Sequence, residues 1–226
     1  MTDMINTSAA CWVAAVRSFI LRGSEIPGFT GRVDVALPQG QETYAKLAGR
    51  LPFSLPEAVS AFLLAGSARC KFRYEWKPKG KVAEQLQAAL AGEEKVFGGS
   101  DLCHAAAFSR WHKDCRAWAN ETWIAEYPDD QATWLNSLPI AAIANGDYLG
   151  VDLRGAKSDP PVVYLSHDEE SRVIAPSFTG FLQSWAGLCY IGPEIWLLEN
   201  FLDERTGWLD STSERAKKLR ELFGVI

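Results

Sequence analysis

The clearest pattern along this chain of 226 residues is an unbroken alternation of apolar and charged positions over residues 69–77. Successive side chains of a strand point to opposite faces, so the pattern predicts a β-strand that buries one face only. The buried face would carry Cys70, Phe72, Tyr74 and Trp76. The basic residues of the other face could form an anion site, but no Gly-rich phosphate loop lies nearby. We favour a solvated outer face whose charges protect a sheet edge.

A second pattern predicts a β-hairpin. Residues 145–147 (Asn-Gly-Asp) are typical of a turn, and residues 149–153 then alternate as a strand does. Residues 162–165 form a short apolar run, as expected of a strand that is covered on both faces. The polar loop between them, residues 154–160, is too short for a crossover helix. The two strands should therefore pair antiparallel.

Helical periodicity accounts for most of the remaining chain, together with capping residues at several ends. Ser211 and Glu214 have the spacing of a capping box. Helices are expected over residues 8–22, 41–49, 57–66, 82–90, 101–123, 177–187, 194–202 and 211–223, and a short strand over residues 32–36. Together with the hairpin, these elements predict helices alongside a sheet that is at least partly antiparallel.

Composition and charge exclude several classes of protein. The net charge of −5 gives no indication of a nucleic-acid binder, and no apolar run approaches the length of a membrane span. Five cysteines are scattered in apolar company, which predicts reduced, buried thiols rather than a disulfide framework. No secretory signal is visible, so we expect a cytoplasmic protein.

One cluster has the residue types of a zinc site: Cys103, His104, His112 and Cys115. If residues 101–123 form one helix, His104 and Cys115 lie roughly 16 Å apart along its axis, at about 1.5 Å per residue. One metal ion cannot bind both through bonds of about 2.0–2.3 Å. We therefore expect a buried cysteine and a surface histidine on an amphipathic helix, and we predict neither a metal nor another cofactor.

Catalytic residue types also gather near the hairpin. Residues 166–168 (Ser-His-Asp) are the types of a hydrolytic triad, but consecutive side chains do not aim at one point and no Gly-x-Ser-x-Gly elbow occurs. Carboxylates are grouped there as well: Asp147, Asp152, Asp168, Glu169 and Glu170. They could include an acid/base pair, and a shared acidic rim is the simpler interpretation. Asp147 could also serve the turn alone by accepting bonds from nearby amides.

Several short segments carry a further indication because they occur together and in a fixed order. They are Leu51-Pro52, Pro56-Glu57, Phe62-Leu63 and residues 72–76, 138–141, 145–153, 161–168, 175–178 and 181–182. As a set they resemble domains of the SUKH superfamily, the group of the yeast Smi/Knr-type cell-wall regulators. The resemblance covers roughly residues 41–202, with the Gly-Asp…Asp-Leu hairpin at its centre.

The resemblance implies a SUKH-like α+β domain without catalysis. Its fold would be a single, mostly antiparallel (mixed) β-sheet with helices packed against it. Residues 1–40 would be an N-terminal helical extension, residues 41–202 the domain, and residues 203–226 a C-terminal helix packed on it. Bacterial members of such families are commonly immunity proteins, which neutralise a cognate polymorphic toxin by direct binding. A regulatory or scaffold domain of the same fold without a toxin is the alternative, and a carboxylate- or metal-dependent hydrolase is a third.

A function of this kind requires a shaped and charged surface, not a reactive group. The expected partner is therefore a protein, neither a nucleic acid nor a membrane. The acidic rim would suit a basic toxin domain, such as a nuclease, and would speed their encounter. The candidate partner-binding residues are Asp147, Tyr148, Asp152, Asp168, Glu169 and Glu170.

Overall fold

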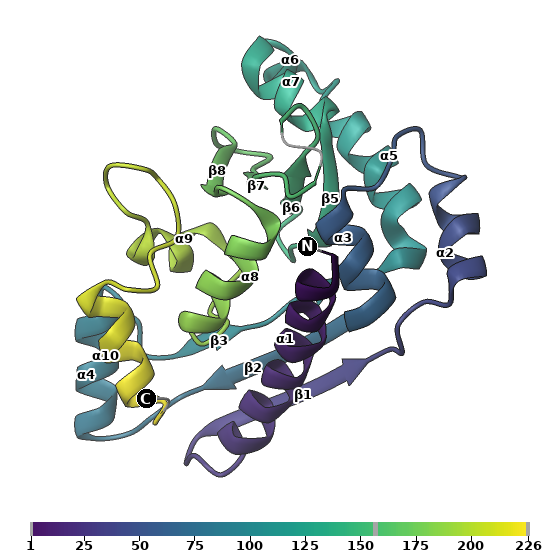
Figure 1. Ribbon diagram of the computed structural model, residues 1–226. Helices are drawn as coiled ribbons and strands as arrows, with labels where there is room; N and C mark the ends of the chain where they lie inside the picture. Colours follow the sequence, from purple (N-terminus) through teal and green to yellow (C-terminus); the bar gives the residue numbers. More distant parts are fainter. Residues whose placement is uncertain (1, 156–157, 225–226) are drawn as a thin grey trace.

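Two β-sheets and the helices around them make up the protein (Figure 1). The computed structural model describes residues 2–155 and 158–224. The predicted α+β class is confirmed, and each described strand pair is antiparallel. The expectation of a single, mixed sheet is wrong, because the described strands divide into two four-stranded sheets.

The first sheet is built around the strand with the alternating pattern. Its strands are β1 (Phe29–Val35), β2 (Cys70–Trp76), β3 (Val96–Gly98) and β4 (Asp101–Leu102). Strand β2 pairs with β1 along one edge, and with β3 and β4 along the other. The predicted one-sided burial of β2 is confirmed, since Cys70, Phe72, Tyr74 and Trp76 are each at most 4% exposed.

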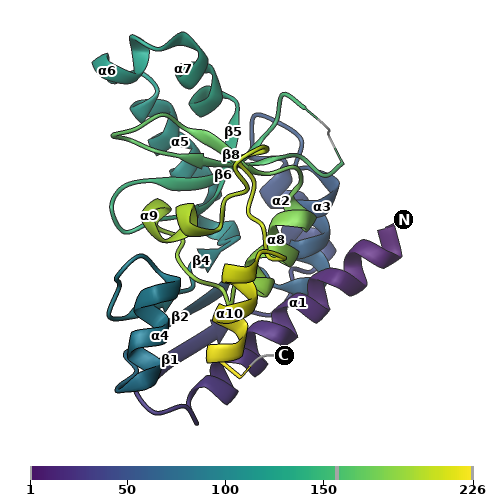
Figure 2. The same cartoon turned by 90° about the vertical axis from the view of Figure 1, so that its left-hand side faces the viewer.

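Helices cover the apolar face of this sheet. Figures 1 and 2 show α1 (Thr2–Gly23) lying across β1 and β2, with α4 (Lys81–Ala89) and α10 (Glu214–Leu222) side by side at one end. The predicted helices near residues 41 and 57 are present as α2 (Gln41–Ala48) and α3 (Glu57–Ala61), the latter continued by a π-helical turn, Phe62–Gly66. Residues 2–40 thus supply both a covering helix and an edge strand.

The second sheet is a meander of four consecutive strands: β5 (Ser137–Ala142), β6 (Tyr148–Asp152), β7 (Val162–Leu165) and β8 (Arg172–Ala175). The predicted hairpin is confirmed, with Tyr148 opposite Leu165 and Val151 opposite Val162. All four residues of β7 are buried, as the apolar run indicated. Helices α5 (Phe108–Trp118), α6 (Thr122–Ala125) and α7 (Pro128–Leu135) precede β5 in the chain.

The expected long helix over residues 101–123 is wrong. The chain instead forms strand β4, a 3₁₀ turn at Ala105–Ala107, and then α5 and α6. Cys103 adopts a positive φ of 50°, which a helix does not allow, and its N–H donates to the carbonyl of Ile140 at 2.7 Å. This bond joins the two sheets where β4 approaches β5. Pairing with distant strands therefore overrides the local helical periodicity.

The C-terminal part of the chain packs between the sheets. Helix α8 (Phe178–Gly187) is capped by the Ser177 hydroxyl, which accepts from the N–H of Gly180 at 3.0 Å. Helix α9 (Ile195–Leu198) continues as a 3₁₀ turn, Glu199–Phe201. The predicted cap of α10 is wrong by two residues, because Ser213, not Ser211, accepts from a helical N–H, that of Ala216.

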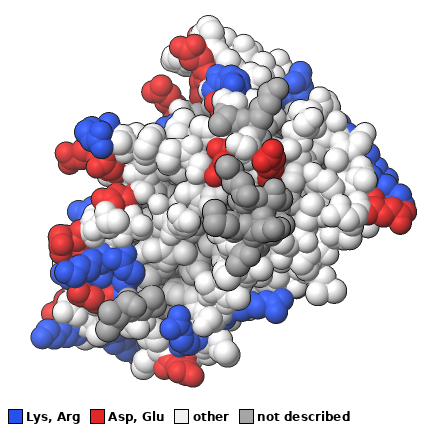
Figure 3. All heavy atoms as spheres, viewed as in Figure 1, with Lys and Arg blue, Asp and Glu red and all other residues white. Residues whose placement is uncertain are grey.

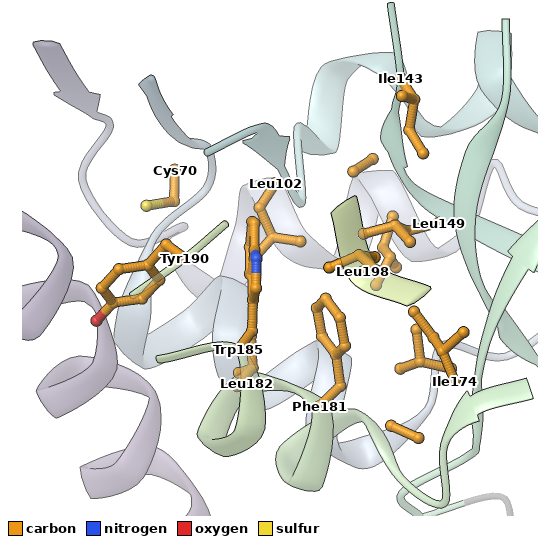
Figure 4. Packing of buried hydrophobic residues seen from close by; sticks show 14 of the residues in the cluster. Cys70, Leu102, Ile143, Leu149, Ile174, Phe181, Leu182, Trp185, Tyr190 and Leu198 are labelled. Carbon is orange, nitrogen blue, oxygen red and sulfur yellow. The ribbon is translucent and has the colours of Figure 1, made fainter. Parts of the chain in front are cut away.

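One hydrophobic core extends through both sheets. In Figure 4, Trp185 on α8 stands between Cys70 and Tyr190 on the side of the first sheet and Leu149 and Ile174 on the side of the second. The indole N–H of Trp12 on α1 donates to the carbonyl of Leu182, also on α8, at 2.7 Å. Large aromatic side chains contribute both buried area and directional contacts here.

Two further expectations from the sequence concern membrane-spanning helices and the burial of the cysteines. No helix within residues 2–155 and 158–224 combines the length and apolar character needed to cross a membrane. The cysteines at 70, 103, 115 and 189 are buried and free, as predicted. Cys11 was expected to be buried and is exposed, because Trp12 occupies the inner face of α1 in its place.

Candidate functional site

The Asn-Gly-Asp turn between β5 and β6 places a carboxylate inside the protein. Gly146 has a φ of 105°, a conformation that side chains other than hydrogen rarely adopt, so the turn can be tight. The next residue, Asp147, is only 1% exposed. Its Oδ2 accepts from the Tyr164 hydroxyl at 2.5 Å and from the Asn145 amide at 2.6 Å. Its Oδ1 accepts from the backbone N–H of His167 at 2.9 Å and lies 2.6 Å from His167 Nδ1.

These bonds decide the charge state of Asp147. Burial by itself would raise the pKa of this carboxyl, because it disfavours the ionised form. The bonds from Tyr164, His167 and Asn145 act in the opposite direction, and together they hold its pKa below the ordinary value. The carboxylate therefore stays ionised and ties the turn to the end of β7.

The same arrangement bears on catalysis and metal binding. Asp147, His167 and Asp168 each offer a ligand atom within 4.8 Å of the others, which is close enough for one ion. A carboxylate has about four acceptor positions, and donors already point at all those of Asp147. The Ser166 hydroxyl donates to Asp168 at 3.0 Å and has no bond to His167, so these residues do not form a triad. We interpret the cluster as a structural anchor.

The four residues considered as a zinc site do not gather around one point, in agreement with the expectation that they hold no common metal ion. Cys103 and Cys115 are buried, and burial raises the pKa of both thiols. His104 instead lies 3.6 Å from a carboxylate oxygen of Asp101. His112 packs edge-on against Phe53, with 5.0 Å between ring centroids. The sequence argument against one metal ion assumed a single helix that does not exist, but the side chains are separated nonetheless.

Beyond the anchor, the loop between β7 and β8 forms one wall of a cavity of about 510 Å³. The opposite wall is the corner between α6 and α7. The residues that line this cavity, here called the acidic cleft, are Trp123, Tyr127, Pro128, Asp129, Asp130, Asp168, Glu169 and Glu170. Asp130 accepts from the N–H of Ser171 at 3.1 Å and so holds the two walls together.

The acidic cleft combines negative charge with aromatic surface. It is lined by five carboxylates and by no lysine or arginine among the described residues. Glu169 is paired with Arg172 at 3.3 Å, whereas Glu170 and Asp129 have no ion-pair partner within the described chain. Tyr127 is 62% exposed. Figure 3 shows acidic side chains, and basic ones beside them, at the end of the molecule where α6 and α7 lie (Figure 1). Carboxylates beside an exposed ring suit an ammonium or guanidinium group.

The six predicted partner-binding residues do not lie on one rim. Asp168, Glu169 and Glu170 line the acidic cleft. Asp147 and Tyr148 are buried, at 1% and 8% exposed, and so cannot be offered to a partner as part of a rim. Asp152 lies at the end of β6, where Arg154 pairs with it at 2.7 Å.

Sequence reasoning did not include the other wall of the cleft. The elements expected from the sequence leave residues 127–131 outside any helix or strand. The signal was present in Tyr127-Pro128-Asp129-Asp130, because a proline followed by two acids is typical of the first turn of a helix. The sequence does not indicate that this turn lies close to residues 168–170 in space.

Comparison with protein-family models places most of this chain in a family. The model of the SMI1 / KNR4 family (SUKH-1) matches residues 41–184, which include the whole acidic cleft and the Asp147 anchor. A search of curated proteins finds no relative that matches this chain.

Proposed function

This chain belongs to the SMI1 / KNR4 family (SUKH-1), and on that premise we propose that it is a non-catalytic binding module that neutralises a cognate toxin. Its partner would be a basic protein domain, bound in the acidic cleft. The observation that carries the proposal is a cleft with five carboxylates and two aromatic side chains, and with no cation among the described residues that line it.

The chemistry of the cleft supports an inhibitor that acts by occupying a surface. A lysine or arginine of the partner would lie against Tyr127 and donate hydrogen bonds to the carboxylates of Glu170 and Asp129. An exposed ring and an adjacent carboxylate each stabilise such a cation. A cleft of one sign of charge also attracts an oppositely charged protein over a distance, which speeds its association.

The rigidity of the site supports the same proposal. Binding is tightest when the groups that contact the partner are already held in place, since less conformational freedom is then lost. The loop of residues 166–171 is fixed at one end by the bonds between Asp147 and His167, and at the other by Asp130 and Ser171. A regulatory module of the same fold would use the same surface, and the toxicity of its partner distinguishes the two functions.

The test begins by capturing the partner from the native host and identifying it by mass spectrometry. The captured protein is then expressed in a sensitive bacterium with and without this chain, and survival is measured. We expect the wild-type chain to restore growth. The triple variant Asp168→Asn, Glu169→Gln, Glu170→Gln should restore it poorly.

A matched control changes the net charge by the same amount, but at positions away from the cleft. Glu25→Gln, Glu94→Gln and Glu204→Gln remove three carboxylates elsewhere, and this variant should protect as the wild type does. Full protection by the cleft variant would remove the acidic cleft from the interface. A captured partner that is harmless to the host would favour the regulatory alternative.

A further inference from the structure

A second cavity, of about 500 Å³, lies on the outer face of the first sheet. Its floor comes from β1, β2 and β3, and its walls from residues 142–144 and residues 192–194. We call it the arginine cavity; the lining residues that matter here are Arg32, Arg73, Ser100 and Glu194. Cavities of roughly 300–1,000 Å³ are typical of small-molecule sites.

The two arginines are directly opposite each other. Arg32 on β1 and Arg73 on β2 are Cα partners in the antiparallel ladder. Like charges at such a position repel and weaken the strand pair. Within residues 2–155 and 158–224, neither guanidinium has an ion-pair or hydrogen-bond partner. An anion between them would turn this repulsion into two favourable contacts.

Two further polar groups of the arginine cavity lack partners. Ser100 is 4% exposed, and its buried Oγ has no hydrogen-bond partner among the described residues. The same holds for Oε2 of Glu194, which is buried as well. An unsatisfied buried polar atom costs stability and calls for an explanation. Both residues line the arginine cavity, so a ligand bound there that reached these two atoms would satisfy both.

Charge in the cavity is not balanced within the chain. Glu75, which also lines it, is paired with Lys95 at 3.2 Å. The remaining charges are the two arginines and Glu194. Burial raises the pKa of Glu194, and the positive charge of Arg73 opposes that rise. With Glu194 ionised, the site carries one excess positive charge. Its two guanidinium groups and one carboxylate all line the same cavity.

We propose that the arginine cavity binds a free α-amino acid through both of its charged groups. The carboxylate would lie between Arg32 and Arg73, as guanidinium groups bind carboxylates in forked pairs. The ammonium group would donate to Oε2 of Glu194, since a buried carboxylate is best satisfied by a cationic donor. The Ser100 hydroxyl would complete the shell of the carboxylate.

This site is separate from the proposed function. The match to the SMI1 / KNR4 family ends at residue 184 and begins at residue 41, so both Glu194 and Arg32 lie outside it. The amino-acid site is tested without any protein partner. If no amino acid binds, the proposal for the acidic cleft still stands. If the acidic cleft binds no partner, the proposal for the amino-acid site still stands.

The experiment is ligand-observed NMR on the full chain with each of the common L-amino acids. At least one should bind saturably. Its N-acetyl derivative, which lacks the ammonium group, and its carboxamide, which lacks the carboxylate, should both fail to bind. These comparisons use the wild-type chain and do not depend on a variant that folds.

Variants then assign the binding to the cavity. Arg73→Gln and Glu194→Gln should each weaken it about tenfold or more, because each removes a bond to a charged group. Arg50→Gln removes an exposed arginine elsewhere and should leave the affinity unchanged. The proposal is overturned if no amino acid binds, if the N-acetyl derivative binds equally well, or if binding survives both cavity variants.

Discussion

The hydroxyl of Tyr164 and the carboxylate of Asp147 meet at 2.5 Å, which joins the middle of β7 to the turn before β6. The same hydroxyl accepts from the N–H of Ile195 at 3.3 Å, at the start of α9. One hydroxyl therefore connects the turn before β6, strand β7 and the C-terminal segment through two hydrogen bonds. The loop that forms the acidic cleft begins two residues after Tyr164, so its position depends on this connection.

Replacing Asp147 should destabilise the fold. Asp147→Asn leaves several buried donors without an ionised acceptor, and we expect a loss of roughly 2–4 kcal/mol in the free energy of unfolding. Tyr164→Phe removes one of the bonds and should cost less, about 1–2 kcal/mol. Urea unfolding measures both. Glu170→Gln, at an exposed position, should stay near the wild type, and a similar stability for all three variants would contradict the role of the anchor.

The depressed pKa of Asp147 predicts a pH dependence. Because the folded state holds this carboxylate ionised to lower pH than the unfolded chain does, the unfolded state binds more protons in the acid range. The stabilisation is complete above the ordinary value of about pH 3.9 and is lost as pH falls through the folded pKa. Stability measured downward from pH 6 should therefore fall less steeply in Asp147→Asn than in the wild type, and equal slopes would refute this.

Glu194 should act in the opposite direction. Its folded pKa is raised by burial, so the folded state binds the proton more tightly than the unfolded chain. Ionisation of Glu194 then lowers stability as pH rises from about 4 through the folded pKa. The stability of Glu194→Gln relative to the wild type should increase over that interval. A constant difference between the two proteins across this range would show that Glu194 is not held in an unfavourable site.

The cap of α10 gives a local test. The Ser213 hydroxyl accepts from the N–H of Ala216 at 3.2 Å, so Ser213→Ala should cost about 1 kcal/mol. Ser211, at the position favoured by the sequence, makes no such bond, and Ser211→Ala should cost less. Thermal unfolding compares the two variants. A larger destabilisation by Ser211→Ala than by Ser213→Ala would show that Ser211 is the capping residue.

The elements predicted best are those in which the spacing of apolar residues directly reflects which side chains are buried. Strand β2 alternates because one face packs on α1 and the other faces solvent. Strands β6 and β7 each lie where the sequence has a run of apolar residues.

The break in the expected helix at Cys103 was missed because its cause is distant in sequence. The N–H of Cys103 bonds to Ile140, 37 residues away in sequence (140 − 103), and no local pattern reports such a bond.

The candidate site was predicted in part for the same reason. Asp168, Glu169 and Glu170 were selected as an acidic group, and they line one wall of the cleft. The burial of Asp147 could not be predicted, because it depends on the approach of Tyr164 and His167 to the turn. The division into two sheets likewise follows from which strands pair with which, and no sequence period encodes that choice.

The proposed function requires that the acidic cleft bind a cationic protein. Calorimetric titration of the captured partner into the wild-type chain and into the triple variant Asp168→Asn, Glu169→Gln, Glu170→Gln, at low and high salt, tests it most directly. We expect the variant to bind roughly tenfold or more weakly, and the wild-type affinity to fall as salt screens the charges. Equal affinities for the two proteins, with no dependence on salt, would contradict the account.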